Sequence, residues 1–174
     1  FSCSSAPKKS NEVNTKKNRA AEYSNFGNNY FNNGNYDQAL LFFNLAYEES
    51  IAADYEPGIS KSANSIAKVY LVLGNTFNAA SYLDEGYETA KKLSNNELTA
   101  ISAINLAEYN IIKKNYTEAE KYLDEAFSAG SRAPFATAEI YHTKAVLEKE
   151  KGNSAEALAF LTKAIEINSR EKSY

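Results

Sequence analysis

The sequence predicts an all-α fold in which helical hairpins stack into a solenoid, and three observations support this prediction. From about residue 16 onward, apolar residues recur at three- and four-residue spacing, which is the period of one helix face. One pattern of small and large residues returns four times, at intervals of 40, 40 and 38 residues. A glycine or asparagine marks a turn at the same place in every unit.

Four sets of equivalent residues define the repeat. The first small residue of each unit is Gly27, Ala67, Ala107 or Ala145, and the second follows twelve positions later at Ala39, Ala79, Ala119 or Ala157. A third small residue lies seven positions after the second, at Ala46, Gly86, Ala126 or Ala164. A large apolar residue lies four positions after the second, at Phe43, Leu83, Leu123 or Leu161. Small residues let two helices approach closely, and the large residue fills the adjoining gap.

This register and the local start and stop signals predict eight helices. They span residues 16–33, 37–54, 57–73, 77–92, 96–113, 117–129, 134–151 and 154–168. Pro57 and Pro134 suit the first turn of a helix, where a missing N–H costs nothing. Capping boxes are predicted from Ser94 to Glu97 and from Thr117 to Glu120. The turns inside the hairpins are Gly34-Asn35, Gly74-Asn75, Lys114-Asn115 and Gly152-Asn153.

The chain divides into a short tether and one repeat domain. Residues 1–15 have no apolar periodicity and are predicted to form a flexible tether. Residues 16–174 form the repeat domain, with units at about 20–56, 57–95, 96–133 and 134–170. Because no hairpin buries its apolar face alone, stacking of neighbouring units makes the core.

Hydropathy and charge exclude two classes of protein. The longest apolar runs, such as Val69 to Leu73, are too short to span a bilayer. Residues 1–19 carry five basic side chains and one acidic one, a net of +4, which leaves −7 for the rest of a chain whose total is −3. A folded body this acidic excludes nucleic acid as a partner, because phosphate binding needs a basic surface. The basic segment itself is either a solvated linker or a contact for an anionic surface.

The pattern resembles the tetratricopeptide repeat over about residues 20–168. The family motif of a large residue, then Leu-Gly, then Tyr is matched in the first unit by Tyr23, Phe26, Gly27 and Tyr30. It is matched in the later units by Ala63, Ile66, Ala67 and Tyr70, by Ala103, Leu106 and Ala107, and by Tyr141 and Ala145. It departs from the family at Asn110, Lys144 and Glu148. The units also exceed the usual length of about 34 residues, so they resemble an extended subclass.

This resemblance implies a superhelix whose first helices line an inner groove for a protein or peptide partner. The residues expected to bind that partner are Asn25, Asn28, Phe31, Asn64, Lys68, Asn105, Glu108 and His142. Asn25, Asn64 and Asn105 lie at nearly equivalent places in their units. A carboxamide both donates and accepts, so these side chains either grip a peptide backbone, as in related repeat proteins, or pack and cap helices.

The sequence lacks the residue patterns of an enzyme. His142 is the sole histidine, and no cluster of metal ligands, phosphate-binding glycine loop or serine elbow accompanies it. We therefore expect no catalytic residues, no metal and no cofactor. Tyrosine and phenylalanine at helical spacing are core residues first, and those in the groove, such as Phe31, are candidate ligand anchors.

The only cysteine, Cys3, lies in the sequence Phe-Ser-Cys-Ser-Ser ahead of a polar spacer. This arrangement resembles the cleavage site of a bacterial lipoprotein, which implies that Cys3 becomes the lipidated first residue. The alternative is an incidental thiol in the tether. Lipidation implies a location in the bacterial cell envelope, anchored to a membrane and facing the periplasm or the surface. Without it, a cytoplasmic location is the alternative.

Three functional hypotheses follow from these features. The first is a non-enzymatic scaffold or adaptor, lipid-anchored, that assembles a complex in the envelope. The second is an oligomeric lipoprotein accessory to a periplasmic solute-uptake system. Phe160 and Ile167 share a face of the last helix that no later helix covers, so the sequence predicts possible self-association there. The third is a soluble regulatory repeat protein, which requires an unmodified Cys3.

Overall fold

A computed structural model describes residues 10–130 and 134–171, and within these ranges the chain forms eight α-helices and no strand. The helices are α1 (Ser10–Asn32), α2 (Tyr36–Ala52), α3 (Glu56–Val72), α4 (Thr76–Lys92), α5 (Asn96–Ile112), α6 (Tyr116–Gly130), α7 (Pro134–Glu150) and α8 (Ser154–Glu171). The predicted fold class and the number of helices are confirmed. Cys3 lies outside the described residues.

The first helix begins earlier than the sequence predicted. Residues 10–15 belong to α1, whereas we expected them in the tether. Local interactions explain the extension. Glu12 lies in the first turn, where a negative charge interacts favourably with the helix dipole and stabilises the helix. Its carboxylate also pairs with the ammonium group of Lys16 at 3.4 Å. Thr15 Oγ1 donates to the carbonyl of Asn11, one helical turn earlier.

The predicted turns inside the hairpins are confirmed by their backbone angles. Gly34, Gly74, Lys114 and Gly152 all have positive φ, between 60° and 89°. The asparagine after the glycine then begins the next helix: the Asn35 side chain accepts from the backbone N–H of Gln38. Positive φ at each hairpin turn thus ends the first helix, and the following residue starts the second.

Both predicted capping boxes were wrong by one or two residues. Asn95, not Ser94, caps α5, because its side chain accepts from the Leu98 N–H at 3.0 Å. Ser94 instead has a φ of 51° and closes the connection from α4. Thr117 lies inside α6, which begins at Tyr116. Asn95 therefore forms the N-cap of α5 instead of Ser94, and the chain changes direction at Ser94.

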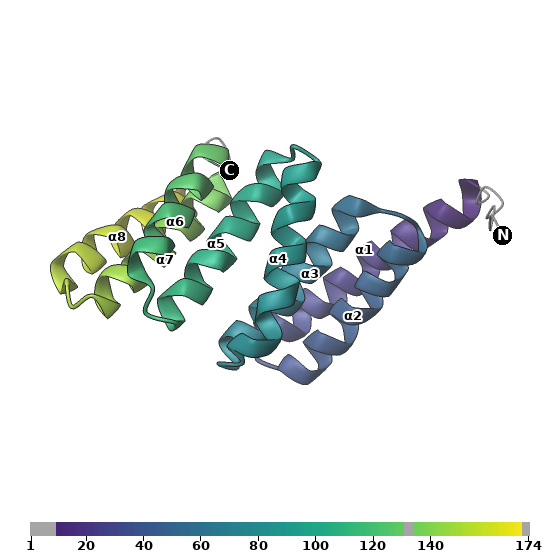
Figure 1. The fold of residues 1–174 in the computed structure, drawn as a ribbon, viewed down its shortest axis with the longest axis horizontal. Coiled ribbons are helices and arrows are strands. Elements are labelled where there is room, and N and C mark those ends of the chain that lie inside the picture. The colour runs from purple at the N-terminus through teal and green to yellow at the C-terminus, as the bar shows by residue number, and fades with distance from the viewer. Residues whose placement is uncertain (1–9, 131–133, 172–174) are drawn as a thin grey trace.

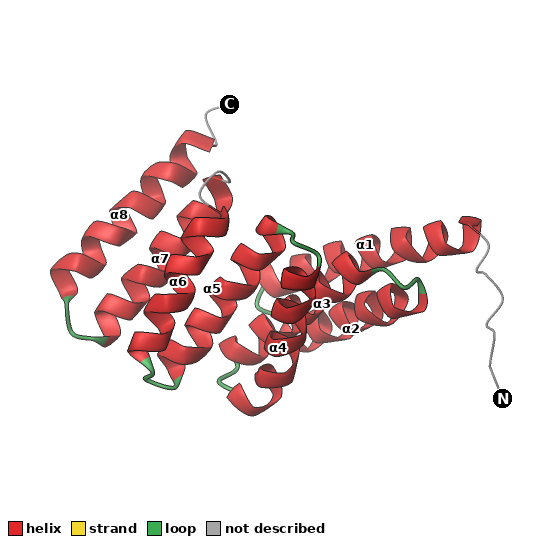
Figure 2. Ribbon diagram, turned by 45° about the horizontal axis from the view of Figure 1, so that its top comes forward, coloured by secondary structure: helices red, strands yellow, loops and turns green. Residues whose placement is uncertain are grey.

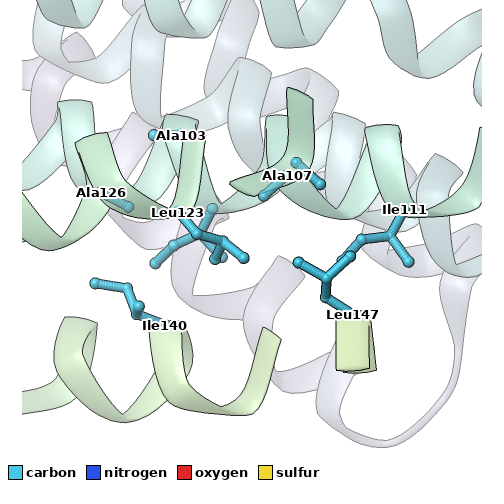
Figure 3. Close-up of a cluster of buried hydrophobic side chains, with 9 residues drawn as sticks. Ala103, Ala107, Ile111, Leu123, Ala126, Ile140 and Leu147 are labelled. Atoms are coloured by element: carbon cyan, nitrogen blue, oxygen red, sulfur yellow. The ribbon is translucent and has the colours of Figure 1, made fainter. Parts of the chain in front are cut away.

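The small-residue register fixes how each hairpin packs. Ala39, Ala79, Ala119, Ala46, Gly86 and Ala126 are buried, as are the large residues Phe43, Leu83 and Leu123. Figure 3 shows this packing around Leu123 of α6, against which Ala103 and Ala107 of α5 and Ile140 of α7 lie. The expectation fails only at the end of the stack, where Leu161 of α8 is 39% exposed.

The hairpins follow one another in a single row, with α1 and α2 at one end and α7 and α8 at the other (Figure 1). The first helices touch their counterparts in the next unit, so α1 contacts α3, α3 contacts α5, and α5 contacts α7. The backbones of the second helices lie further apart, and α2, α4 and α6 meet through side chains such as Tyr47 with Tyr82 and Tyr87 with Tyr122. The first helices therefore form the inner face of a solenoid, and green turns join the paired helices at their ends (Figure 2).

The first two junctions also carry equivalent polar links from one unit to the next. The hydroxyl of Tyr47 donates to the Glu85 carboxylate at 2.7 Å, and the hydroxyl of Tyr87 donates to Glu125 at 2.8 Å. These two bonds are equivalent, because the residues lie 40 positions apart. None of the helices in the described ranges is long and apolar enough to cross a membrane.

Candidate functional site

A cavity of ≈ 230 Å³ opens on the inner face and is lined by all four first helices. Its floor is apolar, formed by Phe31, Phe43, Ile101, Ile104 and Ala136. Its polar lining comes from Ser24, Asn28, Lys61, Asn64, Ser65, Lys68, Asn105 and Glu139. We call this the concave cavity. An apolar floor with a few placed polar groups is the usual composition of a binding pocket.

The concave cavity brings together most of the residues that the sequence predicted as ligand-binding. Asn28, Phe31, Asn64, Lys68 and Asn105 all line it. Glu108 does not line it directly but holds Lys68 at 2.5 Å. The other two predicted residues, Asn25 and His142, are exposed on the described surface and do not line the cavity.

Two of the predicted asparagines are bonded to each other across the junction between α3 and α5. The Asn64 Nδ2 atom donates to Ser102 Oγ at 2.7 Å and to the Ser60 carbonyl at 2.9 Å. The Asn105 Nδ2 atom donates to Asn64 Oδ1 at 3.1 Å. Asn64 is 2% exposed and Asn105 5% exposed. The packing alternative raised for these residues therefore accounts for every Nδ2 hydrogen bond that they make.

The burial of Asn64 explains why one of the repeat's small residues is glycine. A Cβ atom added to Gly86 would lie 2.6 Å from Asn64 Nδ2. The equivalent residues Ala46 and Ala126 face no such carboxamide, so alanine fits there. Ser60 Oγ also donates to the Gly86 carbonyl at 2.7 Å, which holds α3 close to α4.

Asn105 keeps one polar atom available to the cavity. Its Oδ1 accepts no hydrogen bond within residues 10–130 and 134–171. No buried side-chain nitrogen or oxygen in these ranges lacks a partner, so this oxygen is reached by solvent. Asn25 is the equivalent residue of the first unit, where no preceding unit packs against it, and it is exposed for that reason.

The concave cavity and its edge hold two cations, Lys61 and Lys68, and two carboxylates, Glu108 and Glu139. Lys68 pairs with Glu108 and lies 3.6 Å from Glu139, so one cation is shared by two carboxylates from α5 and α7. Lys61 is exposed and forms no ion pair with any residue that the structure describes. The cavity thus offers a free ammonium group, an amide oxygen and an apolar floor.

Two lining residues, Phe43 and Ala136, were missed because they do not lie on the predicted groove positions. Phe43 comes from α2 and reaches the cavity past Gly27. A Cβ atom at Gly27 would lie 2.5 Å from the Phe43 ring. Gly27 lies at a position where the other units have alanine. This difference was the one feature of the sequence that could have indicated a large side chain packed against it.

The structure offers no other site for chemistry among the residues that it describes. It contains no group of three or more His, Cys, Asp or Glu side chains placed to hold a metal ion. Glu108, the one carboxylate among the predicted ligand-binding residues, is paired with Lys68. The arrangement can bind by shape, hydrogen bonding and charge.

Stacked helical hairpins with a cavity along their inner helices define a helical-repeat protein. The tetratricopeptide repeat family model matches residues 98–170, which agrees with the resemblance that the sequence pattern predicted. Repeats of this family are generally non-catalytic and bind other proteins. No curated protein matched the chain.

Two solved structures are similar. The crystal structure of BtubC (BKLC) from P. vanneervenii aligns with a TM-score of 0.64 and 20% identity, over 89% of this chain and 65% of that one. The chain therefore spans about two thirds of that protein's length. The crystal structure of MamA protein aligns over 90% of this chain and 95% of that one, with 15% identity and a TM-score of 0.36. The first likeness supports the fold.

Proposed function

We propose that the protein is a non-enzymatic scaffold that holds an extended segment of a partner protein in the concave cavity. The observation that carries the proposal is the cavity lining, which draws on α1, α3, α5 and α7 together. A segment lying there would contact all four units at once. Binding would bury the apolar floor and so supply a hydrophobic driving force.

The polar groups of the cavity suit a peptide. Asn105 Oδ1 is an acceptor for a backbone N–H, and Lys61 is a donor for a carboxylate or a backbone carbonyl. Because Lys68 is already paired with Glu108, Lys61 is the cation of the lining that has no ion pair within the described residues. The preferred segment therefore combines an apolar residue with an acidic one.

Site-specific photocrosslinking tests this proposal. A photoreactive amino acid is placed at Ser65 of α3, which lines the cavity, and in a second variant at Asn25 of α1, which is exposed but does not line it. Crosslinking by the two variants is compared in cells. We expect one partner to crosslink at Ser65 and not at Asn25. Ser65→Trp, which fills the cavity, and Lys61→Glu should each reduce its recovery from a second crosslinking position at Asn28.

Equal crosslinking at Ser65 and Asn25 would refute a cavity-bound partner. Undiminished recovery with Ser65→Trp would do the same. Because Ser65 is partly exposed, its replacement is compatible with folding, which circular dichroism of the purified variant checks.

Lipid anchoring through Cys3 is part of the proposed function of an envelope assembly factor. Its support is the sequence around the sole cysteine, since Cys3 lies outside the described residues. Two acyl chains would hold the protein on a membrane, whereas one would not. Intact-mass measurement of the natural protein should show the added acyl mass, and Cys3→Ala should release the protein from membrane fractions. An unmodified mass would favour the cytoplasmic, regulatory alternative.

A second candidate function is an oligomeric accessory protein, and the end of the stack favours it. The predicted contact residues Phe160 and Ile167 are half-buried, and Phe160 stacks on Tyr141 of α7 at 6.1 Å. The exposed face of α8 instead carries Leu158, Leu161 and Ile165. Light scattering distinguishes the two functions. A stable oligomer that dissociates in the Leu161→Glu variant supports the accessory protein, and a monomer supports the scaffold.

A further inference from the structure

Phe77 is the most exposed large apolar residue that the structure describes, with 90% of its surface reached by solvent. It lies in the first turn of α4, just after the hairpin turn of the second unit. The equivalent residues of the other units are Asp37, Thr117 and Ala155, all small or polar. An exposed phenylalanine at one of four equivalent positions is not required by the repeat, and no residue of the described chain covers it.

Phe77 borders a cleft of ≈ 680 Å³ between α4 and the ends of α3 and α5. Three tyrosine rings line this cleft: Tyr70 of α3, Tyr82 of α4 and Tyr109 of α5. The rings of Tyr70 and Tyr82 are stacked, with centroids 6.2 Å apart. We call this the tyrosine cleft. It shares no residue with the concave cavity and has its own aromatic chemistry.

The hydroxyl groups of these three tyrosines have no hydrogen-bond partner in the described parts of the chain. Tyr47 and Tyr87 differ, because their hydroxyls donate to glutamates of the next unit. Since no buried polar side-chain atom in these parts is unpaired, the three free hydroxyls are reached by solvent. Burial, followed by the charges of Tyr70 and Glu85, raises the pKa of Tyr82, so its hydroxyl remains a donor at neutral pH.

Two opposite charges flank the aromatic rings. Asp84 of α4 and Lys113 of α5 both line the cleft, and neither forms an ion pair within the described residues. Apart from its rings and Ala80, the lining is polar. A cleft of this kind offers flat apolar faces, free hydroxyl donors and one charge of each sign.

We propose that the tyrosine cleft binds a proline-rich segment of a partner in the polyproline II conformation. Such a segment has no internal hydrogen bonds, so its carbonyls are free to accept from the tyrosine hydroxyls. Its proline rings pack on aromatic faces, and its preformed backbone loses little entropy on binding. Asp84 and Lys113 fix its direction by pairing with charged residues beside the prolines.

An amphipathic helix fits this surface less well. It would need a continuous apolar groove for residues on successive turns. Between its rings the cleft carries Thr76, Asn78 and Ser81 instead, which suit a solvated extended backbone. The spacing of rings and donors therefore favours the extended occupant.

Fluorescence anisotropy with the full chain and a labelled ten-residue polyproline peptide tests the proposal. We expect saturable binding, and none to a glycine-serine peptide of equal length. Phe77→Ala should weaken binding about tenfold, and Tyr82→Phe about three- to tenfold through the lost hydroxyl donor. Adding an arginine beside the prolines should strengthen binding to the wild type and not to Asp84→Asn.

Tyr122→Phe is the matched control, because Tyr122 is the equivalent of Tyr82 in the third unit and does not line the cleft. Phe77 is exposed, so its replacement leaves the fold intact. Equal binding by wild type, Phe77→Ala and Tyr82→Phe would overturn the proposal, as would equal binding of the glycine-serine peptide. Loss of binding with Ser65→Trp alone would assign the peptide to the concave cavity and would also overturn it. Binding of phosphatidylglycerol vesicles through Phe77, without peptide binding, would replace it with a membrane contact.

Discussion

Helices α4 and α8 occupy the same place in the second and fourth units, but among the described residues only α4 has a following hairpin packed against it. Leu83 of α4 is 1% exposed, because α5 packs against the face that carries it. Leu161 of α8 is the equivalent leucine and is 39% exposed. Its neighbours on that face, Leu158 and Ile165, are 66% and 60% exposed. The same residue in the same helix position is core in one unit and surface in the other.

The comparison teaches that the neighbouring unit, not the helix, decides burial in this fold. The polar links follow the same rule. Tyr87 of α4 donates to Glu125 one unit further on. At the next junction the equivalent residues are Phe127 and Lys163, which cannot form that hydrogen bond. The last junction is held instead by apolar contacts such as those of Ile140 and Leu147, and by a different polar link, the ion pair of Lys151 with Glu120 at 2.8 Å.

Leucine-to-alanine changes test the comparison with the largest expected effect. We expect Leu83→Ala to lower the free energy of unfolding by about 3 kcal/mol, because it leaves a cavity under α5. Leu161→Ala should lower it by about 1 kcal/mol, since much of that side chain is already in water. Urea denaturation of both variants measures the difference. Equal losses would mean that α8 is covered in solution, for example by a second copy.

Gly86→Ala tests the close approach of α4 to α3. The added methyl group would meet Asn64 Nδ2 at 2.6 Å, and Asn64 cannot move without breaking its bonds to Ser60 and Ser102. We expect a loss of about 1–3 kcal/mol. In an Asn64→Ala background the same change should stabilise the protein by about 0.5–1 kcal/mol, because alanine is the better helix former. A double-mutant cycle by thermal denaturation measures the coupling; additive effects would exclude the contact.

Tyr87→Phe removes the polar link between the second and third units. We expect a loss of about 1 kcal/mol at neutral pH. Burial, then the hydrogen bond and charge of Glu125, raise the pKa of Tyr87 to about 12 from its ordinary 10. The unfolded chain therefore loses this proton first, and the contribution of Tyr87 to stability falls as pH rises from 10 toward 12. The difference in unfolding free energy between wild type and Tyr87→Phe, measured by denaturation, should therefore become smaller from pH 10 to pH 12. A difference that stays constant would contradict the raised pKa of Tyr87.

Leu158→Ser should have the smallest effect, within about 0.5 kcal/mol, because the side chain is exposed at the free end of the stack. Leu98→Ser is the contrast, since Leu98 of α5 is only 7% exposed and should lose several times as much. Thermal denaturation of dilute protein compares the two. A large effect at Leu158 would reveal an interface on α8.

The repeat register was enough to predict the fold, because each marker recurs four times and each has one packing role. Ala39, Ala79 and Ala119 are buried as the small-residue rule requires. The resemblance to the tetratricopeptide repeat implied that Phe31, Asn64 and Lys68 lie on the inner face, and they do line the concave cavity. The burial of the small residues depends on helix period alone, which the sequence states directly.

The remaining features depend on contacts between units, which a local pattern does not contain. Asn25 and Asn105 are equivalent in sequence, but only Asn105 has a preceding unit to bond to. Phe43 reaches the cavity from a second helix because Gly27 leaves room for its ring. The start of α1 at residue 10 rests on the pairing of Glu12 with Lys16, a local signal that the polar composition of the segment hid.

Because the backbones of the inner helices approach one another and those of the outer helices do not, only side chains connect the outer edge of the stack. Flexing that spreads the outer helices has to break the hydrogen bonds of Tyr47 with Glu85 and of Tyr87 with Glu125. Flexing in the other direction has to separate Asn64 from Asn105 and Lys68 from Glu108. A segment bound across the concave cavity would fix the distances between α1, α3, α5 and α7, and so the curvature of the stack. Binding on the inner face would then change the spacing of the second and third units, which line the tyrosine cleft. A segment bound in the concave cavity would therefore alter the width of the cleft that binds the proline-rich segment.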